Sequence, residues 1–159
     1  MYRGTRLVLV TTVALGLCLV LVSLMFTGFT QGERIAMHAL QYLGRPYVFG
    51  AEGPKSFDCS GLIMYVMADE GIVLPHSAEI MGTDESHRKL ENPRDLLTGD
   101  IVCFDTIRDS DPSDHVGIWL GANQFVHASS GKGEVTISSL EGYYLEHFTG
   151  ARRMVQVYF

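Results

Sequence analysis

The sequence contains 159 residues with a formal net charge of −6 at pH 7, which is enough chain for one domain and a short additional segment. Acidic residues outnumber basic ones, so the chain lacks the positive stripe of a nucleic-acid-binding domain, and we expect no nucleic-acid partner. The three cysteines show no CxxC or Cys/His ligand spacing, which argues against a structural metal site.

The first predicted element is an apolar segment from Leu7 to Phe29, which has no charged residue and follows Arg3 and Arg6. At about 1.5 Å of rise per residue, a helix of this length crosses the hydrocarbon core of a bilayer. The positive-inside rule leaves the N-terminus in the cytoplasm and sends the rest of the chain across. We therefore divide the chain into a cytoplasmic stub with a transmembrane or signal segment, residues 1–31, and a folded domain, residues 32–159.

Three other interpretations of this segment remain open. It can be a signal peptide cleaved near Thr30 or Gly32, a lipoprotein signal ending at Cys18, or a buried core helix. The apolar run is longer than the usual signal h-region of about 7–15 residues, and no clean A-x-A site follows it. Leu17 is also too large for a good lipobox. A signal anchor is therefore the favoured interpretation, with membrane attachment through the N-terminal helix.

Helices are predicted in the first half of the domain. Apolar residues recur at helical spacing over residues 35–43, and the glycine and proline of residues 44–46 end that pattern. A second helix is expected from Ser60 to Glu70, which places Cys59 at its N-terminus. Gly71 ends this helix, and a short third helix is expected after Pro75.

Strands are predicted in the second half, after a turn at Thr98-Gly99-Asp100. Gly121-Ala122-Asn123 forms a tight hairpin between two of these strands. Because helices come first and antiparallel strands follow, we expect an α+β fold. The expected strands are residues 101–105, 116–120, 124–128, 134–137 and 153–158.

Cys59 is a candidate nucleophile because of its position. A free thiol, with a pKa of about 8.5, is mostly protonated at neutral pH, and both the positive end of a helix and an adjacent imidazolium lower that pKa. The backbone N–H of Cys59 is also placed to hold an oxyanion. Cys103 lies in an apolar run instead, and we expect it to be a small buried hydrophobe.

Two of the six histidines are expected to lie next to each other. His115 begins one strand of the predicted hairpin and His127 ends the other, so the two residues share one edge of the sheet. One would act as base to Cys59, and the other would orient it through the second ring nitrogen.

Five segments together resemble the NlpC-type family of cell-wall peptidases, which have a papain-like fold. The resemblance covers about Arg34 to Tyr158. The matching segments, in order, are Gly44-Arg45-Pro46-Tyr47-Val48-Phe49-Gly50, Phe57-Asp58-Cys59-Ser60-Gly61-Leu62, Leu97-Thr98-Gly99-Asp100-Ile101-Val102, Asp114-His115-Val116-Gly117-Ile118-Trp119-Leu120-Gly121 and Phe125-Val126-His127-Ala128-Ser129.

The resemblance implies a role for each matching residue. Cys59 matches the nucleophile, His115 the general base that forms an ion pair with the thiolate, and His127 the residue that orients the base. Three further positions match substrate-binding residues: Tyr47, Asp58 and Ser60.

The resemblance also implies the reaction and its place in the cell. Family members hydrolyse peptidoglycan stem peptides, typically at the γ-D-glutamyl–diamino acid bond, by acyl transfer without metal or cofactor. We expect a bacterial cytoplasmic-membrane protein whose domain faces the periplasm or cell exterior, or a secreted domain if the signal is cleaved. The alternatives are a papain-like amidase or acyltransferase on another envelope substrate and a non-catalytic wall-binding module. The sequence gives no indication of the oligomeric state.

Some positions depart from the family pattern. Ala51 replaces a frequent glycine, and His76 stands where the family usually has arginine. We expect His76 to be a surface substitution, with a role in substrate binding as the alternative. The acidic segment Asp105–Asp114 is expected to be a solvated loop, or a lid because it leads directly into His115.

Overall fold

The computed structural model describes residues 28–107 and 113–154. Almost all of the apolar segment Leu7–Phe29 lies outside these residues. The expected membrane-spanning or signal helix therefore also falls outside the described part of the chain. Among the residues that are described, no helix is both long enough and apolar enough to cross a bilayer. The folded domain is the compact unit that begins at Gln31.

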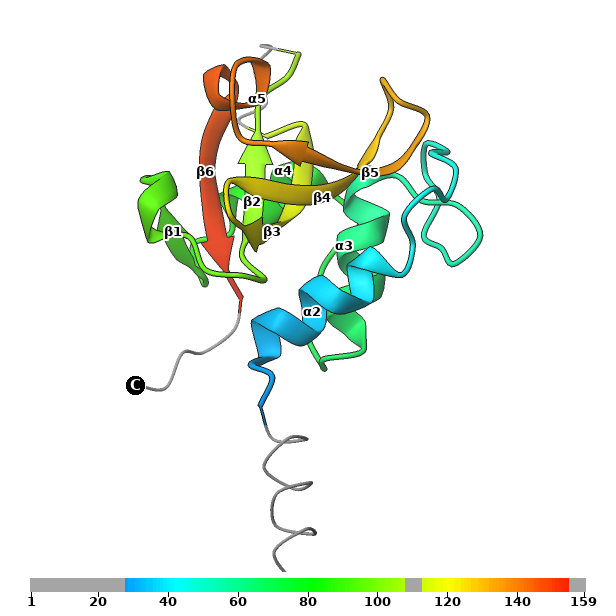
Figure 1. Ribbon diagram of the computed structural model, residues 1–159, viewed down its shortest axis with the longest axis horizontal. Helices are drawn as coiled ribbons and strands as arrows, with labels where there is room; N and C mark the ends of the chain where they lie inside the picture. The colour runs from blue at the N-terminus through cyan, green and yellow to red at the C-terminus, as the bar shows by residue number, and fades with distance from the viewer. Residues whose placement is uncertain (1–27, 108–112, 155–159) are drawn as a thin grey trace, which may run out of the picture. The chain divides into compact units, whose positions relative to one another are not determined.

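A six-stranded antiparallel sheet forms the centre of the domain, in the order β1-β6-β2-β3-β4-β5. The last strand pairs on one side with β2 and on the other with β1, which Figure 1 shows by the position of β6 between them. The strands are β1 (Arg88–Leu90), β2 (Ile101–Phe104), β3 (His115–Gly121), β4 (Gln124–Ser129), β5 (Glu134–Ser139) and β6 (Phe148–Arg153).

The turn between β3 and β4 has the backbone conformation that fits the twist of a hairpin. Ala122 and Asn123 both have positive φ angles, 48° and 62°. Two consecutive left-handed residues form a type I′ turn, which joins twisted antiparallel strands without splaying them. The predicted hairpin is therefore confirmed, and it fixes the register in which Ile118 pairs with Val126.

The helices come mainly from the first half of the chain, as predicted, and α2 and α3 lie together on one side of the sheet (Figure 1). A short helix, α4, follows Pro75 as expected, with Ser77 as its N-cap. The helices are α2 (Gln31–Leu40), α3 (Cys59–Ala68), α4 (Ala78–Thr83), the 3₁₀ turn η1 (Pro93–Asp95) and α5 (Tyr143–Glu146).

Both faces of the sheet are covered by apolar side chains. The larger core packs α2, α3 and α4 against one face, with Leu62, Ile101 and Ile118 fully buried at its centre. The second core lies on the opposite face around Phe104 and Phe125, and Tyr144 of α5 packs against it. Because apolar side chains pack on both faces, β2 and the central residues of β3 and β4 are buried.

A buried ion pair joins β6 to the turn before β2. Arg153 donates from Nε and Nη2 to the Asp100 carboxylate at 2.9 and 2.7 Å, and from Nη2 to the Asp95 carbonyl at 2.8 Å. Both side chains are less than a tenth exposed. The two-point contact fixes the end of β6 against the start of β2.

The sequence did not predict where the last described strand begins. We expected a strand at residues 153–158, most of which lie outside the described residues, whereas β6 runs from Phe148 to Arg153. The strand contains Gly150 and two arginines, a composition that is poor in β-branched residues. Pairing with β2 and burial of Ala151 determine its place instead. β1 and α5 were not predicted either.

Candidate active site

The first turn of α3 is held by the carboxylate of Asp58, which acts as the N-cap. This carboxylate accepts hydrogen bonds from the backbone N–H of Gly61 at 2.7 Å and of Gly50 at 2.8 Å. A side chain at Gly61 would place its Cβ 2.2 Å from the Ala51 carbonyl oxygen, so the loop packs against the helix only because residue 61 is glycine. The cap and the close packing fix the orientation of Cys59.

Cys59 begins α3, as predicted, and its thiol lies near the backbone of Asp114 and Val116. Its side chain is almost buried, and Sγ lies 4.0 Å from the carbonyl oxygen of Asp114, the residue before His115. Burial is the main reason why the pKa of the thiol is raised to about 11, and the Asp58 carboxylate raises it further. Hydrogen bonds from three backbone N–H groups lower the pKa of the thiol: those of Val116, Ser60 and Cys59.

The two histidines of the hairpin are in direct contact, as the sequence predicts. His115 Nε2 lies 2.8 Å from His127 Nδ1, and the two rings are nearly perpendicular, at 84°. With Nε2 of His115 occupied by His127, its Nδ1 is the ring nitrogen left for the thiol. The sequence left open which histidine acts as the base. This geometry favours His115 as the base and His127 as the residue that orients it.

His127 is completely buried, and its position is fixed from its far side. Its Nε2 lies 3.0 Å from the Ser138 hydroxyl of β5 and 3.5 Å from the Tyr144 hydroxyl of α5. The ring also packs against Phe125 and Tyr144. These contacts determine which way the imidazole of His127 faces His115, and they were not visible in the sequence.

The pKa values in this site favour neutral groups. Burial lowers the pKa of His115 to about 4, against a small opposing effect of Asp114, and burial together with His115 and Lys132 lowers that of His127 to about 3. With the thiol pKa raised to about 11, the shifts favour a neutral thiol and a neutral imidazole in the resting site. The directions of these shifts oppose the resting ion pair that the resemblance implied, and they suit general-base chemistry in which His115 takes the proton as Cys59 attacks.

The three residues expected to bind substrate all lie next to Cys59, in different environments. Tyr47 is half buried, and burial, together with the negative charges of a Cys59 thiolate and Asp58, raises its pKa. Asp58 and Ser60 are both buried, and the Ser60 hydroxyl donates to the Asp58 carboxylate at 3.2 Å. Both therefore contribute to the structure of the helix start, while a substrate-binding role for the three stays a prediction.

His76 is not a free surface side chain. Its Nε2 lies 2.8 and 2.9 Å from the two oxygens of Asp58, and its Nδ1 lies 3.0 Å from Glu52. The Asp58 contact is the main cause of a raised pKa at His76, and this contact also helps the backbone hydrogen bonds to lower the pKa of Asp58. The imidazole thus links two carboxylates across the loop before Cys59, a role that our surface interpretation missed.

Cys103 is a buried hydrophobe, as predicted. It is 2% exposed, burial raises its pKa to about 12, and both it and Cys59 are free thiols. Within residues 28–107 and 113–154, no group of three or more His, Cys, Asp or Glu side chains is arranged to hold a metal ion.

The acidic segment before His115 is described only at its two ends. Asp114 accepts hydrogen bonds from the backbone N–H of Thr106 at 2.9 Å and of Ile107 at 2.5 Å, and from the Thr106 hydroxyl at 2.6 Å. These contacts hold the two ends of the segment together. The middle of the segment lies outside the described residues, so its role as a lid or a solvated loop stays a prediction.

Residues 44–153 match the model of the NlpC/P60 family. The chain belongs to this family. That match covers Cys59 and both histidines, and it confirms the resemblance drawn from the five segments.

Relatives with known names support the same assignment. The chain is 40% identical over 122 residues to the γ-DL-glutamyl hydrolase of Bacillus subtilis, covering 75% of this chain and 28% of that protein. It is 36% identical over 129 residues to the murein DD-endopeptidase MepH of Escherichia coli, covering 79% of this chain and 47% of the other. This chain thus spans less than half the length of both relatives.

Solved structures share the fold. NlpC2 from Trichomonas vaginalis superposes with a TM-score of 0.70 at 31% identity, over 79% of this chain and 47% of the other. The NlpC/P60 fold with its antiparallel sheet and few helices is therefore the fold of this domain, as the α+β prediction required.

Proposed function

We propose that the protein is a cysteine endopeptidase that hydrolyses peptidoglycan stem peptides. One arrangement carries the proposal: the 2.8 Å contact between His115 and His127, formed where the Cys59 thiol faces the chain leading into His115. A nucleophile, a base and a residue that orients the base are the three parts that acyl transfer by a thiol needs. The names of the relatives, a γ-DL-glutamyl hydrolase and a murein endopeptidase, support peptidoglycan as the substrate.

In the proposed mechanism, His115 accepts the thiol proton as Sγ attacks the scissile carbonyl carbon. The backbone N–H of Cys59, at the start of α3, is placed to stabilise the oxyanion. The amine leaves with the proton from His115, and an acyl-enzyme remains on Sγ. Water, deprotonated by His115, then attacks the acyl carbon and releases the second product and the thiol. We propose the γ-D-glutamyl–diamino acid bond as the bond that is cut.

The test compares two cysteine variants on defined stem peptides, with products identified by mass spectrometry. Cys59→Ala should abolish cleavage because it removes the nucleophile. Cys103→Ala is the matched control, since it removes the other thiol of the domain, which lies buried in the core opposite Val116, and it should keep most of the activity. Equal turnover by wild type and Cys59→Ala would contradict the proposal. Binding of muropeptides without cleavage at any pH would instead indicate a wall-binding module.

We also propose that the domain acts outside the cytoplasmic membrane, attached by the segment Leu7–Phe29. The apolar segment after two arginines and a cell-wall substrate both support this location. In cells that express the full chain, the domain should fractionate with membranes and be degraded when protease is added to spheroplasts. A protected domain, or N-terminal sequencing that finds a start after Phe29, would contradict membrane attachment.

A further inference from the structure

A second candidate binding site lies away from Cys59, between α4, β1 and β6. A cavity of about 640 Å³ opens there, within the range of about 300–1,000 Å³ that is typical of ligand pockets. None of the proposed catalytic residues lines it. Its lining residues are Gly82, Thr83, Glu85, Ser86, His87, Arg88, Lys89, Thr149 and Arg152.

Arg152 is the unusual member of this lining. It is 5% exposed, and its Nε has no hydrogen-bond partner among the residues that the structure describes. No ion pair among residues 28–107 and 113–154 includes it. A buried guanidinium N–H without an acceptor is costly, because its hydration is lost and nothing replaces it. An anion in the cavity would supply the missing acceptor.

The charges around the cavity also favour an anion. Three permanently positive side chains line it, Arg88, Lys89 and Arg152, against one carboxylate, Glu85. Lys89 is already paired with Glu91, but that pair is largely exposed and therefore weak. His87 also lines the cavity, and its Nδ1 lies 2.8 Å from the carboxylate of Asp84, which is not part of the lining.

We infer that this cavity is a phosphate-binding site whose buried anchor is Arg152 and whose outer cation is Arg88. Phosphate fits better than a single carboxylate because its oxygens can accept bonds from two arginines and a lysine together, and Arg forms two-point contacts with such groups. The phosphate of a soluble molecule and that of a lipid headgroup offer the same chemistry.

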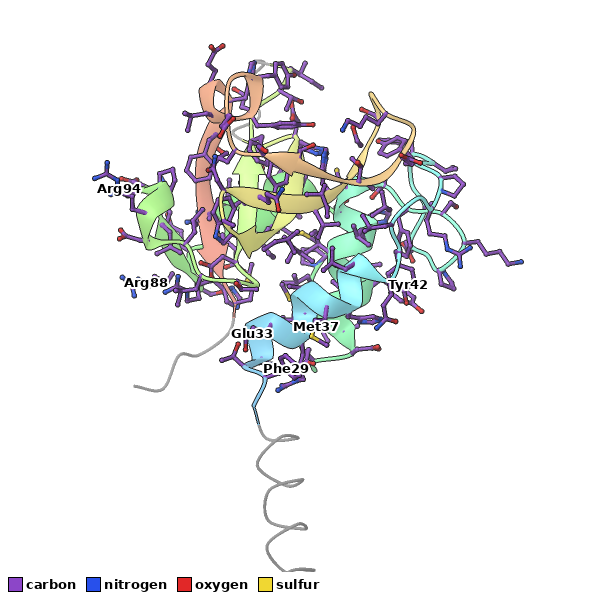
Figure 2. All side chains as sticks on the ribbon, viewed as in Figure 1. Phe29, Glu33, Met37, Tyr42, Arg88 and Arg94 are labelled. Atoms are coloured by element: carbon purple, nitrogen blue, oxygen red, sulfur yellow. The ribbon has the colours of Figure 1, made fainter. Side chains whose placement is uncertain are left out.

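The experiment titrates the full chain, purified in a non-ionic detergent, with inorganic phosphate at constant ionic strength and follows binding by calorimetry. Wild type should show saturable binding, and Arg152→Gln and Arg88→Gln should each weaken the apparent affinity at least fivefold. Arg94→Gln is the matched control, because Figure 2 shows Arg94 apart from Arg88 on the segment from β1 to η1, outside the cavity lining. This variant should bind like wild type.

Arg152 is buried, so its variant can fail for lack of folding, and circular dichroism checks this. The exposed Arg88→Gln variant keeps the test decisive in that case. The inference is wrong if wild type shows no saturable binding below about 10 mM, the range of very weak affinities, or if Arg88→Gln binds phosphate as tightly as wild type. Acetate binding as tight as phosphate would contradict the choice of phosphate.

Two further ligands distinguish a soluble phosphate from the phosphate of a lipid headgroup. sn-Glycerol 3-phosphate represents a soluble phosphate, and phosphatidylglycerol in mixed micelles represents a headgroup. Binding of either that weakens in Arg88→Gln supports the site and identifies the source. Binding of both that does not depend on Arg88 contradicts it. The inference is independent of the proposed peptidase function, because the experiment measures phosphate binding and not peptide cleavage.

Discussion

His76 connects the residue next to the nucleophile with the loop in front of it. Its ring lies between Asp58 and Glu52, and the Asp58 carboxylate is one cause of the raised pKa of the Cys59 thiol. A positive charge on His76 offsets the negative charge of Asp58 and so limits that effect. His76 is therefore a positioning residue that acts on Cys59 through Asp58.

Replacing His76 by glutamine should reduce kcat/KM. The variant leaves the buried Asp58 carboxylate with an uncompensated charge, and a loss of about 1–2 kcal/mol, typical of a lost hydrogen bond to a charged group, corresponds to roughly a tenfold decrease. His76→Arg keeps the charge and should retain activity close to that of wild type. Steady-state kinetics between pH 6 and 9 measure both variants.

The pH profile distinguishes charge from a purely structural effect. His76 loses its charge as pH rises through its pKa, whereas arginine does not. The ratio of His76→Arg activity to wild-type activity should therefore increase toward pH 9. Equal profiles for wild type, His76→Arg and His76→Gln would show that the charge of residue 76 does not reach Cys59.

The β3–β4 hairpin is the element that creates the histidine pair. His115 and His127 belong to its two strands, and the type I′ turn at Ala122 and Asn123 fixes how these strands meet. A one-residue change in register would turn one imidazole to the other face of the sheet. The turn therefore determines the geometry of the proposed base.

Ala122→Gly should stabilise this turn. Ala122 has a φ of 48°, in the left-handed region where a Cβ costs roughly 1–2 kcal/mol and glycine does not. Part of that gain is lost to the greater entropy of glycine in the unfolded chain, so we expect about 0.5–1 kcal/mol in the free energy of unfolding. Chemical denaturation measures it.

The matched control is Ala122→Val, which adds a β-branched side chain at the same φ angle and should destabilise the protein. A glycine variant that is less stable than wild type would show that the turn is not strained at Ala122. Both variants should keep their activity, because neither side chain contacts the proposed catalytic residues.

Sequence patterns predicted the elements whose local residues determine them. The run from Ile101 and the hairpin were found because apolar residues and turn residues occur at the right spacing, and Cys59 was placed at a helix start for the same reason. The start of β6 at Phe148 was not predicted, since the pairing of Ala151 with Val102 decides its position and its own residues do not. Long-range pairing of this kind leaves no periodic signal in the strand itself.

The same distinction between local and long-range features decides which parts of the candidate site could be predicted. The His115–His127 pair follows from one hairpin, a local feature of the chain. The contacts of His76 with Asp58 and Glu52 join residues that are 18 and 24 positions apart through irregular loops, so no spacing rule indicates them. Arg152 was equally hidden, because nothing in its neighbourhood distinguishes a buried arginine from an exposed one.

For the whole molecule, the pair of His127, which is buried, and His115, which is partly buried, makes stability depend on pH. The pKa of His115 falls from 6.5 to about 4 on folding and that of His127 falls to about 3. Between pH 6.5 and 4 the unfolded chain therefore binds more protons than the folded one. Stability is full above pH 6.5 and is lost as pH falls toward 4, by about 3 kcal/mol for His115 alone if the shift converts fully.

Urea denaturation at pH 7, 5.5 and 4.5 measures this loss. His115→Gln should lose less stability than wild type over this range, because one of the two imidazoles with a lowered pKa is gone. His147→Gln, which lies outside the histidine pair, is the matched control. His76 acts with the opposite sign, since its pKa is raised on folding, but its partial exposure makes that contribution small. Identical slopes for wild type and His115→Gln would contradict the assignment.

The nucleophile and the histidines come from different layers of the domain, Cys59 from a helix in the first half of the chain and the imidazoles from the sheet in the second half. A chain that is still emerging from the ribosome, or still unfolded during the proposed export, thus carries a thiol without a base. For a peptidase that cuts wall material, folding itself becomes the activation step. The unfolded chain therefore has none of the proposed activity, which appears only after the sheet has packed against α3.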